Sequence, residues 1–274
     1  MSDMSANFAV LDSRALLRVT GPDWRSFLQG LLSNDVEALP EGEQRFAALL
    51  TPQGRFLFDM FIIAGADGAL LDVQAAQRSA LAARLQIYRL RAKVEIGLAD
   101  GQVCALWGVE QAPAGWAADP RLPALGFRGV GMSPPPGAAV RDEAAYGAFR
   151  LGLGTPDPAS DCIPDKTYPI EADFDLLNGI DFRKGCYVGQ ETTSRMKRRG
   201  GIRSRMLPVV FEGPAPPFGT DVLAGDLRAG ELLSGADGRA MALLRLDRIR
   251  GAELTADGRP VRIDPPSWLE LPAE

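Results

Sequence analysis

The residue with the greatest chemical potential in this sequence is Cys186, a thiol between two glycines. Residues 184–191 read Lys-Gly-Cys-Tyr-Val-Gly-Gln-Glu. Gly185 and Gly189 allow backbone angles that other residues avoid, so the chain can turn sharply or approach a ligand there. Because residues 190–197 favour a helix and Lys184 adds a positive charge, we predict that an exposed Cys186 is a reactive thiolate. The residue type alone favours the alternative, a small buried hydrophobic side chain.

The sequence contains no histidine. Its absence removes the commonest general base, the commonest zinc ligand and the Ser-His and Cys-His nucleophile pairs. The other cysteines, Cys104 and Cys162, are too widely spaced for a CxxC metal knuckle. We therefore expect no resident metal, and any chemistry must use carboxylates, the thiol or a bound cofactor.

Basic residues gather around this thiol. Between Arg183 and Arg205 there are eight basic residues and one acid, Glu191, in a chain with a net charge of −5. Six of them lie in the downstream run Arg195, Lys197, Arg198, Arg199, Arg203 and Arg205. The pattern predicts a local cationic surface on an acidic protein, or simply a solvated face.

Alternating strands and helices must position these residues. The pattern predicts a strand over 15–19, then a helix whose apolar face carries Trp24, Phe27, Leu28, Leu31 and Leu32. A hairpin is expected over 46–50 and 56–63, joined by the turn 51–54. A helix over 76–91 should lead into a strand over 92–96.

The second half of the chain has a different pattern of predicted elements. A short helix is expected over 143–149, followed by a long loop over 154–169. After Gly200 and Gly201, which suggest a mobile connection, short strands over 207–211, 230–234 and 241–246 indicate a separate β-barrel. We expect residues 1–200 to hold two interleaved α+β subdomains and residues 201–274 to form the barrel.

The motif at residues 184–191, KGCYVGQE, resembles the motif KGCYxGQE of the YgfZ-type folate-binding proteins and their mitochondrial relatives. The resemblance extends over nearly the whole chain, including residues 27–36, the turn 51–55 and the C-terminal segment. It implies an α+β fold like that of the aminomethyltransferase of glycine cleavage, arranged as a ring of domains with a small C-terminal β-barrel.

The same resemblance implies a function and a cofactor. YgfZ-type proteins bind tetrahydrofolate or a folate derivative and support the assembly or repair of iron–sulfur proteins, with the motif cysteine tied to function. Carried over, Cys186 and Lys184 are the central site residues. The resemblance places Gly185, Tyr187, Gly189, Gln190, Glu191 and Arg195 around them.

Carboxylates are expected to hold the pterin, because a buried carboxylate can accept two parallel hydrogen bonds from its ring. Glu171 resembles the glutamate that aminomethyltransferases place against the pterin, and Asn34 is a further candidate in the resembling segment 27–36. Asp59 lies in an apolar strand where an unpaired charge is costly, so it needs a ligand or a partner. Phe58 replaces the first of two aspartates at the matching aminomethyltransferase stretch, which puts glycine-cleavage chemistry in doubt.

Three functions follow as alternatives. The first is a folate-dependent maturation factor in which Cys186 makes a transient contact with an iron–sulfur cluster, a scaffold or a client protein. The second is a transferase that moves a one-carbon unit beside Asp59. The third is a tRNA-modification accessory protein whose basic segment near Arg198 touches phosphates.

Composition sets the remaining expectations. A chain of 274 residues with 46% hydrophobic residues can bury a full core. The start of the sequence lacks the basic and apolar segments of a secretion signal, and no run approaches the roughly 20 apolar residues of a membrane span. With three scattered cysteines, we expect a monomer in the reducing cytoplasm, without a membrane partner.

Overall fold

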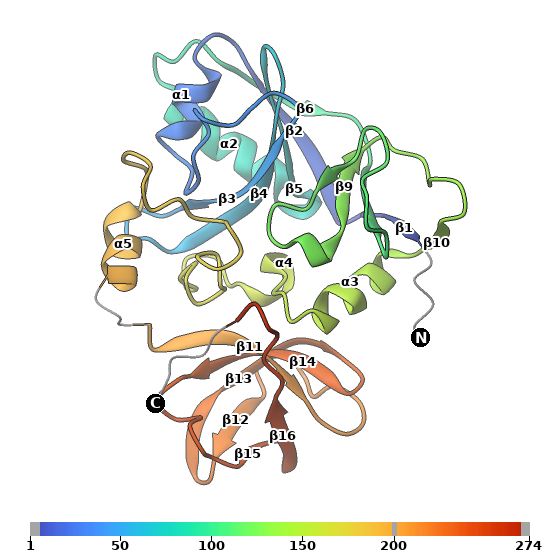
Figure 1. Ribbon diagram of the computed structural model, residues 1–274. Coiled ribbons are helices and arrows are strands. Elements are labelled where there is room, and N and C mark those ends of the chain that lie inside the picture. The colour runs from blue at the N-terminus through green and yellow to red at the C-terminus, as the bar shows by residue number, and fades with distance from the viewer. Residues whose placement is uncertain (1–5, 199–201, 270–274) are drawn as a thin grey trace.

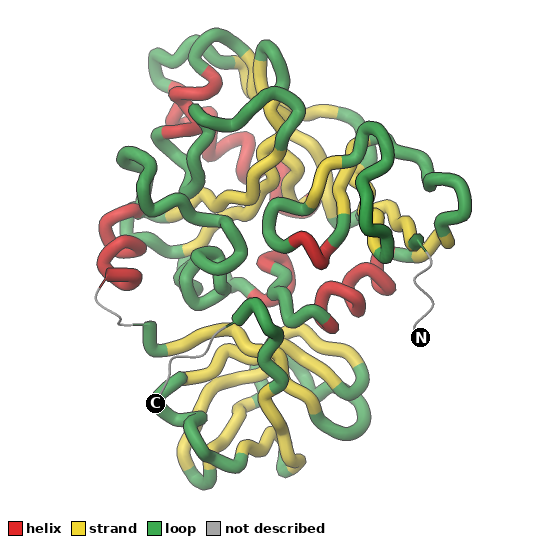
Figure 2. The backbone as a smooth tube through the Cα atoms, in the orientation of Figure 1, coloured by secondary structure: helices red, strands yellow, loops and turns green. Residues whose placement is uncertain are grey.

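The computed structural model describes residues 6–198 and 202–269 as two five-stranded sheets and a closed barrel. These three bodies surround the loops of residues 162–189, which contain no helix or strand (Figures 1 and 2). The predicted boundary between residues 200 and 201, the glycine pair at that boundary and Arg199 lie outside the described residues.

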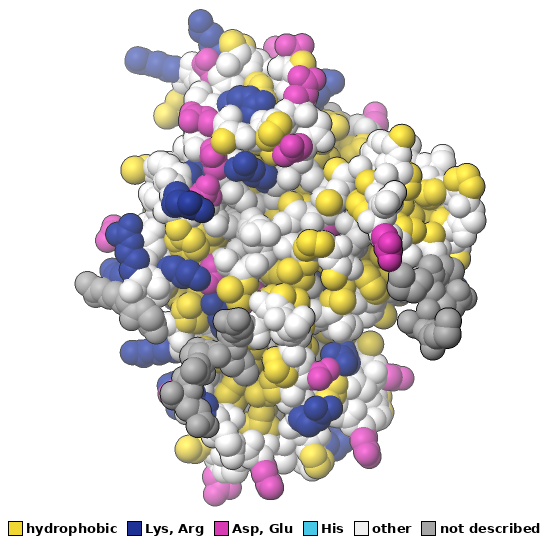
Figure 3. Space-filling view, viewed as in Figure 1, with side chains coloured by type: hydrophobic (Ala, Val, Ile, Leu, Met, Phe, Trp, Pro, Cys, Tyr) yellow, Lys and Arg dark blue, Asp and Glu magenta, His cyan; other side chains and the backbone are white. Residues whose placement is uncertain are grey.

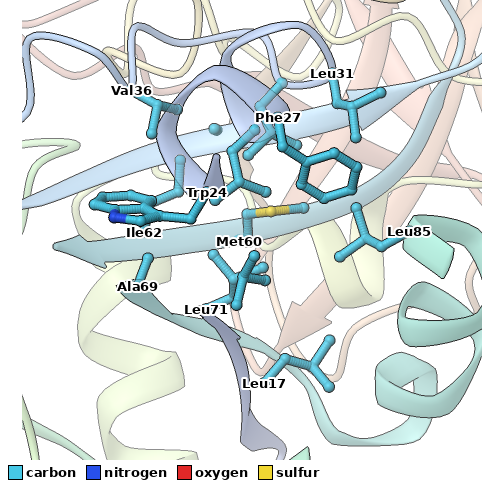
Figure 4. Close-up of a cluster of buried hydrophobic side chains, with 14 of the residues drawn as sticks. Leu17, Trp24, Phe27, Leu31, Val36, Met60, Ile62, Ala69, Leu71 and Leu85 are labelled. Atoms are coloured by element: carbon cyan, nitrogen blue, oxygen red, sulfur yellow. The ribbon is translucent and has the colours of Figure 1, made fainter. Parts of the chain in front are cut away.

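The first sheet carries two helices on one face. Its strand order is β3 (Gln44–Leu50), β4 (Phe56–Ala64), β5 (Gly68–Gln74), β2 (Arg14–Thr20) and β6 (Glu95–Ala99), all antiparallel. The helices are α1 (Trp24–Gln29) and α2 (Arg78–Arg89), the latter preceded by the 3-10 turn η1 (Ala75–Gln77). Trp24 and Phe27 from α1 and Leu85 from α2 converge on Met60 (Figure 4). The predicted apolar helix face is therefore the core of this layer.

The opposite face of the first sheet packs on the central loops. Phe46 stacks on Phe174 with ring centroids 4.6 Å apart, and Ile170 and Tyr187 join the same buried cluster. The loop that carries the cysteine motif is thereby anchored to the sheet through apolar contacts, which contribute roughly 25 cal/mol per Å² of buried apolar surface.

The second sheet is smaller and lies beside the first. Its order is β10 (Ala139–Arg141), β1 (Asn7–Val10), β7 (Val103–Trp107), β9 (Phe127–Val130) and β8 (Ala117–Ala118). The 3-10 turn η2 (Pro123–Leu125) precedes β9, and α3 (Glu143–Gly152) covers the sheet. Asp142 caps α3 by accepting a hydrogen bond from the Ala145 amide, which satisfies one otherwise unpaired helix donor.

The predicted barrel is present. It runs β11 (Ser204–Val210), β14 (Arg239–Arg245), β13 (Leu227–Ala236), β12 (Asp221–Ala224), β15 (Leu254–Ala256) and β16 (Arg259–Ile263), and closes between β16 and β11. Arg205 of β11 ties the barrel to the central loops by donating hydrogen bonds to the carboxyl groups of Asp173 and Asp175.

Three predicted elements differ from the structure. Helix α1 ends at Gln29, although the predicted apolar helix face extended to Leu32. The strand expected over 92–96 begins at Glu95, because Leu90 adopts a left-handed conformation (φ 43°) that turns the chain before it can extend. The expected loop 154–169 contains one helical turn, α4 (Pro158–Asp161), capped by Asp157.

Candidate functional site

Cys186 lies exposed in the loop that precedes α5 (Gln190–Arg198). The predicted helix therefore follows the motif, although Cys186 lies four residues before its first residue. The effect of a helix dipole is confined to the terminal turn. Exposure, the condition for a reactive thiol, is met, and the thiolate itself stays a prediction.

Lys184 clamps this loop to the end of α1. Its side chain is buried, and its Nζ donates to the carbonyl oxygens of Gln29 at 2.8 Å, Leu32 at 2.6 Å and Asn34 at 2.8 Å. Gln29 is the last residue of α1, so its carbonyl lacks an intrahelical donor, and the ammonium also satisfies two carbonyls in the segment that follows the helix. Burial lowers the pKa of Lys184 to about 8. All three of its protons are thus committed to the backbone, and the residue positions the loop.

The glycines of the motif have different roles. Gly189 has a φ of 83°, and a Cβ there would lie 2.5 Å from the Thr51 carbonyl oxygen. The motif therefore packs directly on the turn 51–55, which is possible only without a side chain. A Cβ on Gly185 would meet no atom within 4 Å, and Gly185 does not adopt a positive φ. Its surroundings are open.

The remaining motif residues divide between the core and the surface. Tyr187 is buried below the ammonium of Lys184, 5.1 Å from Nζ to the ring centroid, and burial raises its pKa to about 12. Gln190, Glu191 and Arg195 line an open hollow of about 500 Å³ along α5 together with Ser194 and Arg198. The motif thus presents a polar helix face beside the exposed thiol.

A second hollow lies where three segments of the chain meet. Its volume is about 460 Å³, and its walls are Asn34, Gln44, Arg45, Phe46, Pro120, Asn178, Ile180, Asp181, Phe182 and Arg183. We call it the central cavity. Asp181 and Arg183 belong to the segment immediately before Cys186, although Cys186 is not among the lining residues.

Side-chain amides hold the walls of the central cavity together. Asn34 donates to the carbonyls of Phe46 at 2.8 Å and Asn178 at 2.6 Å, and Gln44 donates to Ala118 at 2.8 Å. Asn34 also accepts from the Asp35 amide, so it shapes the wall without a free hydrogen-bonding group. One oxygen of Asp181 accepts from the amides of Arg183 and Lys184, and the other has no partner among the described residues.

The two predicted pterin carboxylates do not line the central cavity. Glu171 is half-buried, its carboxylate accepts from the Tyr168 amide at 2.9 Å, and burial raises its pKa. Asp59 is buried on β4, where Arg14 donates to one oxygen at 2.8 Å and Gln74 to the other at 2.9 Å. The expected partner of Asp59 is therefore protein, and β4 is an internal strand of its sheet.

Asp59 is part of a buried ionic network that the sequence did not reveal. Arg14 also pairs with Asp72 at 2.6 Å, Asp72 pairs with Arg128, and Arg121 pairs with Asp119 at 2.7 Å. Burial alone would raise the pKa of Asp72, but the guanidinium groups of Arg128 and Arg14 lower this pKa. The sequence signalled only Asp59, and Asp72, one charge within the apolar run of β5, is a second signal of the same kind.

The cationic surface is smaller than expected. Lys184 and Arg205 are buried, and Lys197 pairs with Asp175 at 2.8 Å. Four arginines are exposed and form no ion pair with the described residues, namely Arg183, Arg195, Arg198 and Arg203. Basic side chains gather along the edge of the molecule that carries α5 (Figure 3).

Neither a metal cluster nor a membrane-spanning helix is present in residues 6–198 and 202–269. No group of three or more cysteine, aspartate or glutamate side chains in these ranges is arranged to hold a metal ion. No helix there has the length and apolar character needed to cross a membrane.

Comparison with known proteins gives both a family model and relatives. Residues 203–271 match the model of the CAF17 C-terminal beta-barrel domain. The chain is 32% identical to the mitochondrial iron–sulfur cluster assembly factor IBA57 of Mus musculus over 88% of this chain and 78% of that protein. The same values hold for the Homo sapiens protein. A Neurospora crassa homologue is 36% identical over 85% of this chain, which spans 60% of that relative's length.

A solved structure matches the fold. The aminomethyltransferase T of the glycine cleavage system from Bartonella henselae superimposes with a TM-score of 0.75 over 97% of this chain and 87% of that one, at 17% identity. The predicted aminomethyltransferase-like fold with a C-terminal barrel is confirmed. The predicted cytoplasmic location is contradicted, because the relatives are described as mitochondrial.

Proposed function

Because the chain belongs to the IBA57 family of iron–sulfur cluster assembly factors, we propose that it supports cluster assembly through Cys186 while a folate occupies the central cavity. The cluster is cargo in this proposal and not a resident cofactor. The YgfZ-type assignment that the motif indicated stays a prediction. Clients and scaffolds of iron–sulfur assembly are the partners that the family membership supports.

The observation that carries the proposal is the contrast between the three thiols. Cys186 is exposed, whereas Cys104 and Cys162 are buried. Burial raises the pKa of Cys104 and raises that of Cys162 well above its usual range, so neither is suited to act as a thiolate. A single thiol cannot complete a cluster site, so the other ligands of a bound cluster must come from a partner.

Tetrahydrofolate is the ligand that we propose for the central cavity. The volume of about 460 Å³ falls within the range of small-molecule sites, roughly 300–1,000 Å³. The unpartnered oxygen of Asp181 can accept from the donor edge of a pterin, and Arg45 and Arg183 lie on the same walls to meet the glutamate carboxylates. We therefore assign to Asp181 the role that was expected of Glu171 and Asp59.

The ionic network disfavours the transferase alternative. Both carboxylate oxygens of Asp59 are occupied, one by Arg14 and one by Gln74. A group held in this way is not free to accept a proton from a reacting amine. This favours folate binding without one-carbon transfer.

Alkylation of Cys186 tests the thiol half of the proposal. Anaerobic addition of a scaffold protein carrying a [2Fe–2S] cluster should slow iodoacetamide labelling of Cys186, read by mass spectrometry, whereas the same scaffold without its cluster should not. Equal labelling with both forms of the scaffold would mean that Cys186 does not contact the cluster.

Calorimetry tests the folate half. Asp181→Asn keeps the oxygen that accepts from the backbone and removes the negative charge, so tetrahydrofolate binding should weaken by about ten-fold or more. Asp226→Asn, on an exposed turn of the barrel, should bind as the parent does. Absence of binding to the parent protein, or unchanged binding by Asp181→Asn, would rule out this pocket.

A further inference from the structure

The end of α2 and the neighbouring strand β6 expose large apolar side chains. Ile87 is 66% exposed, Leu90 88% and Leu98 55%. They are three of the seven large hydrophobic side chains that are exposed among residues 6–198 and 202–269. An exposed group of apolar side chains of this kind marks an interaction site more often than an isolated one does.

The exposed face of α2 carries one of them, and the residue that directly follows the helix is another. Ala83 and Ile87 lie four residues apart on this outward stripe, Leu90 caps the end of α2, and Leu81 and Leu85 point into the core. Gln86, beside Ile87, donates to the Ile96 carbonyl of β6 at 3.3 Å. The outward stripe of α2 therefore runs next to β6.

Strand β6 is the last strand of its sheet. Among the described strands it pairs with β2 alone, and Leu98 lies opposite Leu17, whose side chain belongs to the core cluster beneath α2. Leu98 therefore points to the face that carries α2 and yet remains exposed. A sheet edge with unpaired backbone groups beside apolar side chains is a template for an added strand.

The turn between α2 and β6 is strained in the same place. Leu90 has a φ of 43°, a conformation that costs a residue with a large side chain about 1 kcal/mol or more. The turn holds the leucine in solvent instead of returning it to the core. Such strain is retained where the surrounding structure or a function requires it.

The charge around these side chains selects an acidic occupant. Arg84, Arg89, Arg91 and Lys93 are exposed and form no ion pair with the described residues, whereas the chain as a whole carries a net charge of −5. Glu95 is the acid at the start of β6. The charge of this region is thus positive whereas the net charge of the protein is negative, which favours association with a negatively charged partner.

We propose that α2 and the edge of β6, here called the α2–β6 surface, dock an acidic segment of a partner protein. Apolar residues of the segment cover Ile87, Leu90 and Leu98, and its carboxylates meet the arginines that flank them. A protein is favoured over a lipid surface because the unpaired edge of β6 presents a row of backbone donors and acceptors that an added strand matches in register and a lipid does not. This inference is independent of the proposed role of Cys186.

Fluorescence anisotropy with a labelled synthetic peptide tests the docking surface. The peptide alternates leucine with glutamate, and a companion carries lysine in place of glutamate. The acidic peptide should bind the full chain, and the double variant Ile87→Ser with Leu90→Ser should weaken binding by about ten-fold or more. The matched variant Val140→Ser with Leu227→Ser removes two other large exposed apolar side chains, 66% and 64% exposed, and should bind as the parent does.

Two further readouts complete the test. Amide hydrogen exchange in residues 95–99 should slow when the acidic peptide is bound, because β6 gains a neighbour. The proposal is overturned if the lysine peptide binds equally well, or if both double variants bind alike. It is also overturned if vesicles of phosphatidylcholine and cardiolipin bind the α2–β6 surface while the acidic peptide does not, since the occupant would then be lipid.

Discussion

Gly54 and Gly189 meet face to face, and each leaves room for the other. A Cβ on Gly54 would lie 3.0 Å from the Gly189 carbonyl oxygen, and a Cβ on Gly189 would lie 3.0 Å from the Gly54 Cα. Both residues adopt a positive φ, 80° and 83°. The hairpin turn and the cysteine motif can thus pack in direct backbone contact because neither glycine has a side chain.

Gly189→Ala should therefore destabilise the protein and displace the motif. The positive φ and the contact with the Thr51 carbonyl act together, so we expect a loss of about 2–4 kcal/mol in the free energy of unfolding, measured in urea. Gly185→Ala is the matched control, because its surroundings are open, and it should change stability by less than about 0.5 kcal/mol. Equal effects of the two substitutions would refute the packing argument.

Lys184→Met should loosen the loop that carries Cys186. The variant keeps the apolar stem but leaves three carbonyls at the end of α1 without their donor, at a cost of about 2–3 kcal/mol in unfolding free energy. Lys197→Met removes one ion pair of a more exposed lysine and should cost less than about 1 kcal/mol. If the two substitutions lower the free energy of unfolding by the same amount, the hydrogen bonds of Lys184 do not stabilise the loop.

Arg14→Met should be among the most damaging single changes in the chain. It leaves the carboxylates of Asp59 and Asp72 buried with one fewer cation, which costs about 3–5 kcal/mol in a buried network. Arg18→Met, at an exposed residue of the same strand, is the control and should be nearly neutral. Thermal unfolding of the two variants distinguishes a structural network from a set of incidental contacts.

Asp173 predicts a dependence of stability on pH. Burial raises the pKa of Asp173 to about 8. Burial alone would also raise that of Asp175, but Arg205 and Lys197 lower it. Arg205 thus donates hydrogen bonds to both carboxyl groups, and Asp175 is the ionised member of the two acids. An unfolded aspartate has a pKa of about 4, so between about pH 4 and 8 the folded state holds the extra proton, and stability falls as the pH rises through this window.

Asp173→Asn checks the sign of this effect. The asparagine imitates the protonated acid, so the variant should lose this part of the pH dependence and gain stability relative to the parent as the pH rises from 5 to 8 in urea titrations. Asp226→Asn should follow the parent curve. A parent protein whose stability rises over the same window, with Asp173→Asn flat, would show that the carboxylate is ionised and stabilising.

The regular elements were predictable because their signals are local. The apolar face of α1, the hairpin of β3 and β4, and the helix after the motif all follow from spacing within a dozen residues. The start of β6 was missed because a strained turn at Leu90 overrides the alternating pattern. A short helix within 154–169 was missed because four residues carry almost no periodicity.

The site was only partly predictable for a different reason. The motif identified Cys186, whereas the clamp by Lys184 depends on carbonyls about 150 residues away in sequence. The ionic network likewise joins Arg14 to Asp72 and Arg128, which no local pattern connects. Asp181 was overlooked as a cavity residue because the central cavity exists only where three distant segments meet.

The most direct test of the central claim replaces Cys186 by serine in cells that depend on this chain. The side chain is exposed, so the variant should fold with unchanged thermal stability while the activities of iron–sulfur enzymes fall toward those of cells without the protein. Cys104→Ala, which removes a buried thiol, should retain them if it folds. Full iron–sulfur enzyme activity with a folded Cys186→Ser protein would contradict the role assigned to this thiol.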